Sequence, residues 1–480
     1  MPAWMATLGP LLLPADDPAQ LLPAREQMAF TLGFHIILVP FGVAFTFLML
    51  IANARGIRRN DETALLLARR WSQVAAVLFA VGAVSGTVLS FELGLLWPRL
   101  MGAYGAAFGI PFAVEGLFFF LEAIFVAIYI YGWRRMRPWP HFWTGVPVVL
   151  SGIGGTASVV AANSWMNRPG GFTVREGRIV QVDPLAVIFN GAFWYESVHM
   201  LLAAYMVAGF IIAGVYGVGM LRGRRDRYHR LGLLIPLTVA AVATPLQIVV
   251  GDVAAREVYR NEPAKFAAIE AVPRTGTHVP EVLGGYYADG EVHAGIRIPN
   301  GASLLSGYSP STRIRGLDAV PADVRPPDRL VAIVHLGFDV MVGIGSALLA
   351  LSAWYALAWW RRRDLPRSRW FLRATAVSGP LAVVALEAGW VVTEVGRQPW
   401  TVVGHLLTRD AVATNGNLWL FFAATLLLYA AVGAATIYVL RLIRARWRDQ
   451  GGAREGEVPY GPSRAREAAA GEAPAVEGRS

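Results

Sequence analysis

The amino-acid sequence predicts an all-α integral membrane protein, a bundle of nine transmembrane helices with one long loop on the outer side. Of its 480 residues, 55% are hydrophobic and only 16% are charged, and the mean hydropathy is +0.45. Soluble domains carry about 25% charged residues, so most of this chain faces something other than water. Apolar stretches of about 20 residues, enough to cross a bilayer, recur along the chain. We expect them at 29–51, 71–91, 106–132, 142–164, 194–221, 231–250, 330–359, 372–394 and 418–442.

Arginines gather in every second connection between these spans and indicate which side faces the cytoplasm. Short cytoplasmic loops carry an excess of basic residues, which explains the net charge of +10 without a nucleic-acid partner. The N-terminus is then outside and the C-terminus is cytoplasmic. The arginine clusters lie at 55–70, 134–137, 222–230, 361–369 and 441–446.

The connections divide the chain into five parts. The apolar run Leu11–Leu13 is too short for a signal peptide, so the N-terminal part is expected to be a short interfacial segment. The long outer loop shows little apolar periodicity and is expected to be functional or disordered. The five parts are an N-terminal segment at 1–28, spans one to six at 29–250, the outer loop at 251–329, spans seven to nine at 330–442, and a disordered cytoplasmic tail at 443–480.

The absence of cysteine limits the redox chemistry that the chain can support. It excludes disulfides, thiolate attachment of haem and iron–sulfur clusters ligated by this chain. A redox cofactor would have to be held by histidine, methionine or carboxylate side chains.

Ionisable residues within the spans are functional candidates, because charge is costly in hydrocarbon. Residues three or seven apart lie on one face of a helix, and three such pairs occur. Glu92 is expected just past the end of the second span. The candidates are His35, the pair Glu115 and Glu122, the pair Glu196 and His199, and the pair Glu387 and Glu394.

Four potential iron ligands are predicted to lie at one depth, in the outer half of the membrane. They are His35, His199, Met341 and Glu394, each from a different span. Histidine, methionine and occasionally oxygen ligands hold haem iron. Each also has an ordinary explanation: a hydrogen-bonded packing histidine, a core methionine, or a glutamate paired with Arg397.

Two further charged sites lie near the outer surface. Lys265 is the only lysine in the chain, and with Glu270 it could hydrogen-bond a quinol and accept its proton. A solvated helix with one charge pair is the ordinary alternative. Arg397 suits an anionic partner such as a haem propionate or Glu394, or it is an interfacial arginine.

Several motifs together resemble cytochrome bd oxidase subunit I. The resemblance covers residues 25–442 in the family's order and is most specific at Gly396-Arg397-Gln398-Pro399-Trp400. The other matching segments are 25–35, 90–97, 114–122, 163–166, 341–345 and 387–394.

The resemblance implies which residues hold haem. His199 and Met341 would be the axial ligands of a low-spin haem b. His35 and Glu394 would ligate two high-spin haems, one of b type and the other haem d or a further haem b. Trp390 and Arg397 would lie beside the haems.

The resemblance also assigns the proton and quinol residues. Glu115 and Glu122 would pass protons towards the oxygen site or gate its charge, and Lys265 and Glu270 would form the quinol pair of the periplasmic loop. Many members have an arginine where this chain has Asp339. With its short loop and His335, the chain resembles the cyanide-insensitive branch.

The implied function is that of a terminal quinol oxidase in the bacterial cytoplasmic membrane. Electrons from quinol would pass to the low-spin haem and then to the high-spin pair, where O2 is reduced to water. Protons released outside and taken up from the cytoplasm would build a gradient without pumping. The implied partners are subunit II and small single-helix subunits. Two alternatives remain, a haem b anchor of a quinone-linked dehydrogenase and a proton-coupled transporter without haem.

Overall fold

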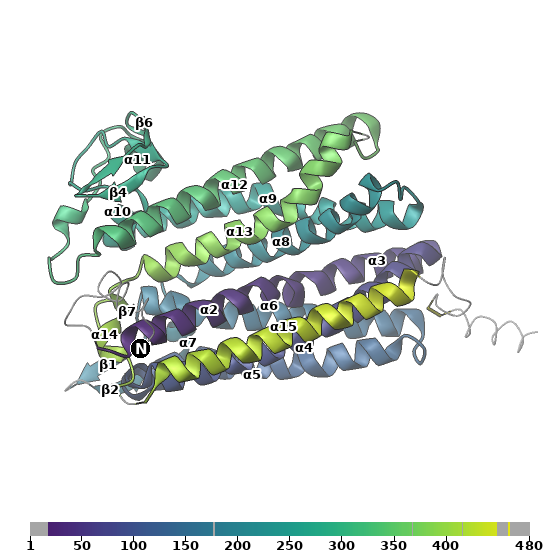
Figure 1. The fold of residues 1–480 in the computed structure, drawn as a ribbon, viewed down its shortest axis with the longest axis horizontal. Coiled ribbons are helices and arrows are strands. Elements are labelled where there is room, and N and C mark those ends of the chain that lie inside the picture. The colour runs from purple at the N-terminus through teal and green to yellow at the C-terminus, as the bar shows by residue number, and fades with distance from the viewer. Residues whose placement is uncertain (1–17, 176–177, 367, 415, 449–458, 461–480) are drawn as a thin grey trace, which may run out of the picture.

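Long, nearly parallel helices dominate the structure, a computed structural model that describes residues 18–175, 178–366, 368–414, 416–448 and 459–460 (Figure 1). Within these ranges, nine helices are long and apolar enough to cross a membrane. This number confirms the predicted fold class.

The first four membrane helices follow one another through short connections. The first is continuous from Leu21 to Arg59, with a π-helical segment in its middle. Only Trp97 separates the second membrane helix from the third. The elements are α2 (Leu21–Pro40), η1 (Phe41–Phe45), α3 (Thr46–Arg59), α4 (Glu62–Leu96), α5 (Pro98–Gly132) and α6 (Pro138–Asn167).

The remaining five membrane helices include two that are joined by a long segment at one end of the bundle. They are α8 (Phe193–Leu221), α9 (Arg227–Asn261), α12 (Asp328–Arg362), α13 (Arg369–Val395) and α15 (Leu418–Arg448). A short helix α7 (Pro184–Ile188) and the hairpin β1 (Phe172–Arg175) with β2 (Arg178–Val182) precede α8. The strands β7 (Trp400–Val402) and β8 (Leu406–Leu407) and the helix α14 (Thr408–Ala411) precede α15.

The segment between α9 and α12 is folded and not disordered. It contains the antiparallel pairs β3 with β6 and β4 with β5. Its buried apolar side chains, among them Ala267, Tyr287 and Leu317, pack with Val331 and Val334 of α12. The elements are α10 (Pro263–Ile269), β3 (Glu281–Leu283), β4 (Tyr286–Ala288), β5 (Glu291–His293), β6 (Ile296–Ile298), α11 (Gly301–Gly307) and η2 (Leu317–Ala319).

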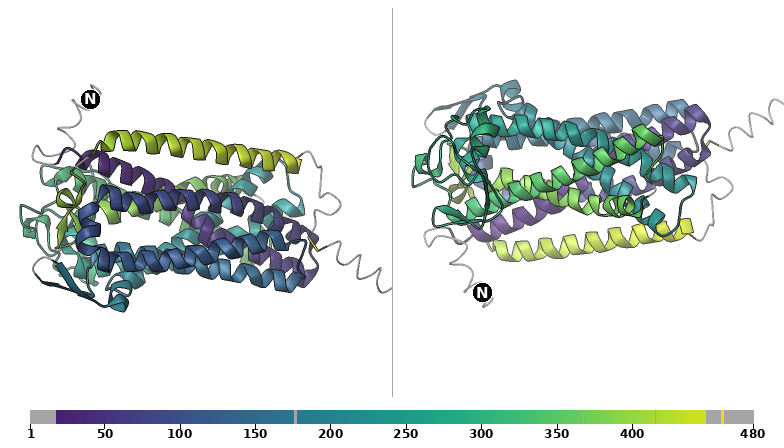
Figure 2. Two further views of the ribbon diagram at one scale, coloured as in Figure 1. Left: turned by 90° about the horizontal axis from the view of Figure 1, so that it is seen from below. Right: turned by 90° about the horizontal axis from the view of Figure 1, so that it is seen from above.

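The helices pack as two neighbouring groups. In one group α8 packs against α9 and α13, and α13 against α12; in the other, α5 packs against α6, and α3 against α4. The last helix, α15, lies along α2 and α4 at the edge of the bundle (Figure 2). The small strands and short helices gather at one end, which we call the loop end (Figure 1). The opposite end carries the arginine clusters, and we call it the arginine end.

Three expectations about element boundaries differ from the structure. The first membrane helix begins at Leu21, inside the range expected for the N-terminal segment. Glu92 lies within α4 and not past its end, because its carboxylate accepts hydrogen bonds from Gln27 and Thr31, which allow it to be buried. The predicted disordered tail falls mostly outside the described residues, although α15 continues to Arg448.

Candidate functional site

The loop-end half of α13 brings together residues from three other helices. Asn163 of α6 donates a hydrogen bond to the Glu394 carboxylate. A Cβ atom placed on Gly389 would lie 3.0 Å from Sδ of Met341 in α12. Glu387 reaches α2, where a Cβ atom on Gly33 would lie 3.3 Å from Oε2. The predicted ligands Met341 and Glu394 therefore belong to one region.

His35 is oriented by a hydrogen bond from a neighbouring helix. Its Nδ1 lies 2.9 Å from Ser85 Oγ, and that hydroxyl donates its own proton to the carbonyl of Gly82. The hydroxyl must then accept from His35, so Nδ1 carries the proton and Nε2 keeps its lone pair. This is the arrangement by which proteins orient a metal-binding histidine.

His199 lies on α8 against the backbone of α9. A Cβ atom on Gly251 would lie 3.3 Å from its Cε1. Its buried Nδ1 has no hydrogen-bond partner within the described part of the chain. A buried imidazole nitrogen without a partner is unusual in a folded protein and fits a site that a bound group completes.

Each predicted histidine or methionine ligand thus lies against a glycine of an adjacent helix. The three glycines are Gly86, Gly251 and Gly389. Each of these side chains therefore lies close to a backbone that carries no side chain. Trp390, half-buried next to Gly389, packs against the core that α8, α12 and α13 share. These residues fit axial ligation of haem.

Asn167, at the end of α6, connects the predicted quinol lysine with this region. Its Oδ1 accepts hydrogen bonds from Lys265 Nζ at 3.0 Å and from Arg397 Nη1 at 3.4 Å. Its Nδ2 donates to Glu196 Oε1 at 3.0 Å. Arg397 in turn donates to Glu394 at 2.5 Å. Asn167 was not a predicted site residue, because a neutral amide in a membrane helix does not stand out in the sequence as a charged side chain does.

A cavity of about 920 Å³ opens beside Lys265 at the loop end. Its lining includes Glu262, Lys265, Asp318, Arg397 and Trp400. Lys265 and Glu262 are buried and form an ion pair. The volume lies within the range of small-molecule sites, and its charged lining can hydrogen-bond a polar head group. Glu262 was not a predicted site residue.

Glu270 lies at the other end of α10 and faces a different set of groups. Burial raises the pKa of Glu270 well above its ordinary value, and the neighbouring Glu281 and Asp339 raise it further. The pKa of Glu281 is also raised, first by burial. The structure does not bring Lys265 and Glu270 to one cavity lining, since only Lys265 lines the 920 Å³ cavity.

His335 fixes the position of the loop beside these carboxyl groups. Its Nδ1 lies 2.9 Å from the carbonyl oxygen of Ile269, and its Nε2 lies 3.2 Å from that of Gly284. The backbone N–H of Gly284 donates to Asp339 at 2.5 Å. His335 and Asp339 therefore connect α12 to both α10 and the strands.

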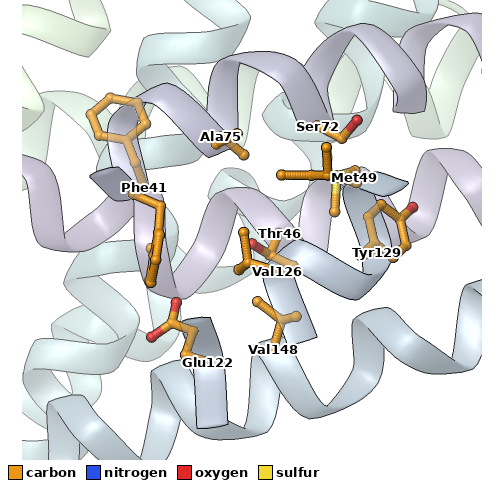
Figure 3. Close-up of a pocket in the computed structure, with 13 residues that line it drawn as sticks. Phe41, Thr46, Met49, Ser72, Ala75, Glu122, Val126, Tyr129 and Val148 are labelled. Carbon is orange, nitrogen blue, oxygen red and sulfur yellow. The ribbon is translucent and has the colours of Figure 1, made fainter. Parts of the chain in front are cut away.

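Glu122 lines a second, small cavity of about 20 Å³, in the middle of the other helix group (Figure 3). Phe41, Thr46, Ser72 and Tyr129 also line it. A cavity of this size can hold one water molecule. Glu115 lies two turns from Glu122 along α5 and is half-buried.

Comparison with known proteins agrees with these features. Residues 23–446 match the family model described as cytochrome bd terminal oxidase subunit I. The chain belongs to this family. It is 34% identical to a bd menaquinol oxidase subunit I of Bacillus subtilis (strain 168), over 88% of this chain and 95% of that protein. It is 29% identical to a cytochrome bd ubiquinol oxidase subunit 1 of the same organism, over 88% and 92%.

A solved structure of the family shares the fold. The bd oxidase from Geobacillus thermodenitrificans matches with a TM-score of 0.82 and 33% sequence identity, covering 90% of this chain and 99% of that chain. The chain is therefore the catalytic subunit I of a cytochrome bd quinol oxidase, a quinol:O2 oxidoreductase with haem cofactors and a subunit II partner. The dehydrogenase anchor and the haem-free transporter are excluded by this membership.

Proposed function

We propose that quinol is oxidised in the 920 Å³ cavity at the loop end and that three haems are held beside it. The low-spin haem b would be held by His199 and Met341, and the two high-spin haems by His35 and Glu394. Of these two, one is a haem b and the other a haem d or a further haem b. The observation that carries the proposal is the Asn167 network, which joins Lys265 at the cavity to Glu394 through Arg397.

Lys265 would orient the quinol by donating a hydrogen bond to one of its oxygens. Glu262 lines the same cavity and pairs with Lys265, so its carboxylate is placed to accept a quinol proton. Glu270 and Glu281 would take up the proton in the following step. A carboxyl pair that is buried and close in space holds one proton in common and passes it on when a second arrives.

The residues around the haems would orient the ligands and balance charge. Ser85 holds His35 with Nε2 available, and Asn163 and Arg397 hold the Glu394 carboxylate. Haem, when bound, supplies the electron transfer and the oxygen chemistry. Arg397 has its Nε buried without a hydrogen-bond partner among the described residues, which suits a nearby anionic group such as a propionate.

Protons for oxygen reduction would come from the arginine end, which we assign to the cytoplasm. Glu122 and Glu115 would carry them along α5 towards the high-spin haems. Quinol protons would leave at the loop end, on the periplasmic side. Release on one side and uptake on the other build a proton gradient without a pump.

The ligand assignment is tested by the reduced-minus-oxidised absorption spectrum of the purified oxidase. His199→Ala removes one axial ligand of the low-spin haem, so its absorption band should be lost while the high-spin bands remain. His278→Ala, at an exposed position of the loop, is the matched control and should leave the spectrum unchanged. A spectrum unchanged by His199→Ala would contradict the assignment.

A further inference from the structure

One carboxylate at the loop end of α8 has no part in the proposed transfer of quinol protons. Glu196 lies one helical turn from His199, on the same face of α8, and both side chains are half-buried. Residues placed in this way have Cβ atoms about 5–6 Å apart. A charge on Glu196 would therefore act on any group that His199 binds.

The Glu196 carboxylate is held by a hydrogen bond from a neutral side chain. Asn167 Oδ1 faces two cations, Lys265 and Arg397, and accepts from both. The Nδ2 of the same amide therefore points the other way and donates to Glu196 Oε1 at 3.0 Å. This hydrogen bond orients the carboxylate but brings no positive charge to it, because the amide is neutral.

The charges around Glu196 do not balance. Two cations and three carboxylates gather here, from α8, from the start of α10 and from the end of α13. Lys265 pairs with Glu262, and Arg397 pairs with Glu394. Glu196 has no cation of its own at ion-pair distance within the described part of the chain. When ionised, it is therefore an uncompensated negative charge, and its protonation responds to any further charge nearby.

The charged groups on α9 and at the end of α6 have partners of their own. Arg256 pairs with Asp252 on α9, and Arg168 lies 3.8 Å from Glu257. Each of these pairs is neutral as a whole. Neither pair therefore offsets the charge of Glu196.

We propose that Glu196 takes up a proton when the low-spin haem held by His199 is reduced, and releases it when the electron moves on. An added electron makes the surroundings of Glu196 more negative, which favours the neutral carboxyl group. A unit charge about 10 Å from a carboxylate in a protein changes its proton affinity about tenfold. Oxidation of quinol releases electrons and protons in equal number, so each electron that arrives can be matched by one O–H bond formed on Glu196. This inference rests on the proposed ligation of haem by His199.

The test is a redox titration of the low-spin haem band of the complete oxidase at a series of pH values. In the unaltered enzyme, the midpoint potential should fall as the pH rises through the range in which Glu196 titrates. Glu196→Gln keeps an acceptor for the Asn167 hydrogen bond and removes the charge. Its potential should equal that of the unaltered enzyme in acid, where Glu196 is neutral in both redox states. In alkali it should be higher by about 59 mV, the equivalent of a tenfold change for one electron.

Two further variants separate charge from structure. Glu196→Asp keeps a carboxylate that titrates and should keep the pH dependence. Glu291→Gln, at an exposed position of β5, makes the same chemical change elsewhere and should behave as the unaltered enzyme. Equal potentials at every pH in Glu196→Gln and the unaltered enzyme would overturn the role of Glu196. If His199→Ala nevertheless removes the low-spin band, the ligand assignment stands; if that band persists, the assignment and this inference fail together.

Discussion

Three glycines have a specific role because of what lies against them. A glycine beside His35, His199 or Met341 lets that side chain lie close to the neighbouring backbone. A side chain added at any of these three glycines would collide with the neighbouring histidine or methionine side chain and would not point into solvent. These glycines carry no charge and no reactive group, so their importance follows only from the packing of the helices.

Gly389→Ala is expected to displace Met341 from its position. The added Cβ atom would lie 3.0 Å from Sδ, closer than most such contacts, so the thioether must move. We expect a weakened or shifted low-spin haem band with little change in the high-spin bands. Gly433→Ala is the control, because a Cβ atom there meets no atom within 4 Å. An unchanged band in Gly389→Ala would show that Met341 is not a ligand.

Lys265 can be tested at its own cavity. Lys265→Met keeps the length of the side chain and removes the charge that pairs with Glu262, leaving that buried carboxylate without its cation. The variant also loses the hydrogen bond that orients the quinol, about 1.5–3 kcal/mol for a charged donor, so quinol-driven reduction of the haems should fall by at least about tenfold. Dithionite, which does not use the cavity, should still reduce the haems fully. Asp289→Asn, at an exposed turn of the loop, is the control.

Charged residues in the spans could be predicted from the sequence, whereas their neutral partners could not. The cost of placing His35, Glu122 or Glu394 in hydrocarbon makes each stand out in an apolar stretch. Asn163 and Asn167 form hydrogen bonds to Glu394 and Lys265 only because α6 ends beside α10 and α13. That arrangement depends on helix packing, which one sequence does not reveal.

At the scale of secondary-structure elements, helix number was predicted correctly and helix length was not. An apolar window ends at the first charge, but α4 runs from Glu62 to Leu96 and includes Arg70 and Glu92, both buried. Hydrogen bonds from Gln27 and Thr31 to Glu92, and the Tyr228 ring over the Arg70 guanidinium, make this burial possible. The strands of the loop were missed for a different reason, since each spans only three residues and gives too short a pattern for alternation to be detected.

The docking of the loop should depend on pH through Glu270. Its pKa is raised when the loop is docked, so the docked state retains a proton that the free loop releases above about pH 4.3. Docking is then strongest in acid, weakens as the pH rises towards the raised pKa, and levels off above it. We expect the protection factors of amides in β3 and β6, corrected for intrinsic exchange, to fall over that range.

Glu270→Gln removes one titrating group and should reduce this pH dependence, while Glu281, whose pKa is also raised by burial, keeps part of it. Asp289→Asn, in an exposed turn of the same loop, should leave it intact. Equal slopes in the unaltered protein and in Glu270→Gln would show that another group controls docking.

At the scale of the whole molecule, the two ends of the bundle carry different chemistry. The loop end contains the folded segment between α9 and α12, and the arginine end contains the basic clusters (Figure 1). The long apolar faces of α4, α5 and α15 are largely exposed, so they are suited to lipid or to the partner subunit. Orientation in the membrane is therefore a property that the sequence predicts and that labelling can test.

The absence of cysteine makes the orientation directly measurable. A single cysteine can be introduced at Ser311, in the exposed part of the loop, or at Arg224, in the connection between α8 and α9. In intact cells, a membrane-impermeant maleimide should label Ser311→Cys and not Arg224→Cys. After the cells are broken, both should be labelled. Labelling of Arg224→Cys in intact cells would reverse the proposed topology.

The π-helical turn Phe41–Phe45 has a consequence for how the first membrane helix can serve two sites. One additional residue per turn rotates everything beyond it by about 100° relative to an uninterrupted α-helix. His35 lies before the turn and Asn53 after it, so their directions around the helix axis are set independently. Deleting one residue from this segment would restore a regular α-helix. Asn53 would then rotate away from Tyr129, while the position of His35 would not change. One continuous helix can thus present His35 to one site and Asn53 to Tyr129 at another, because the π-helical segment sets the angle between the two directions.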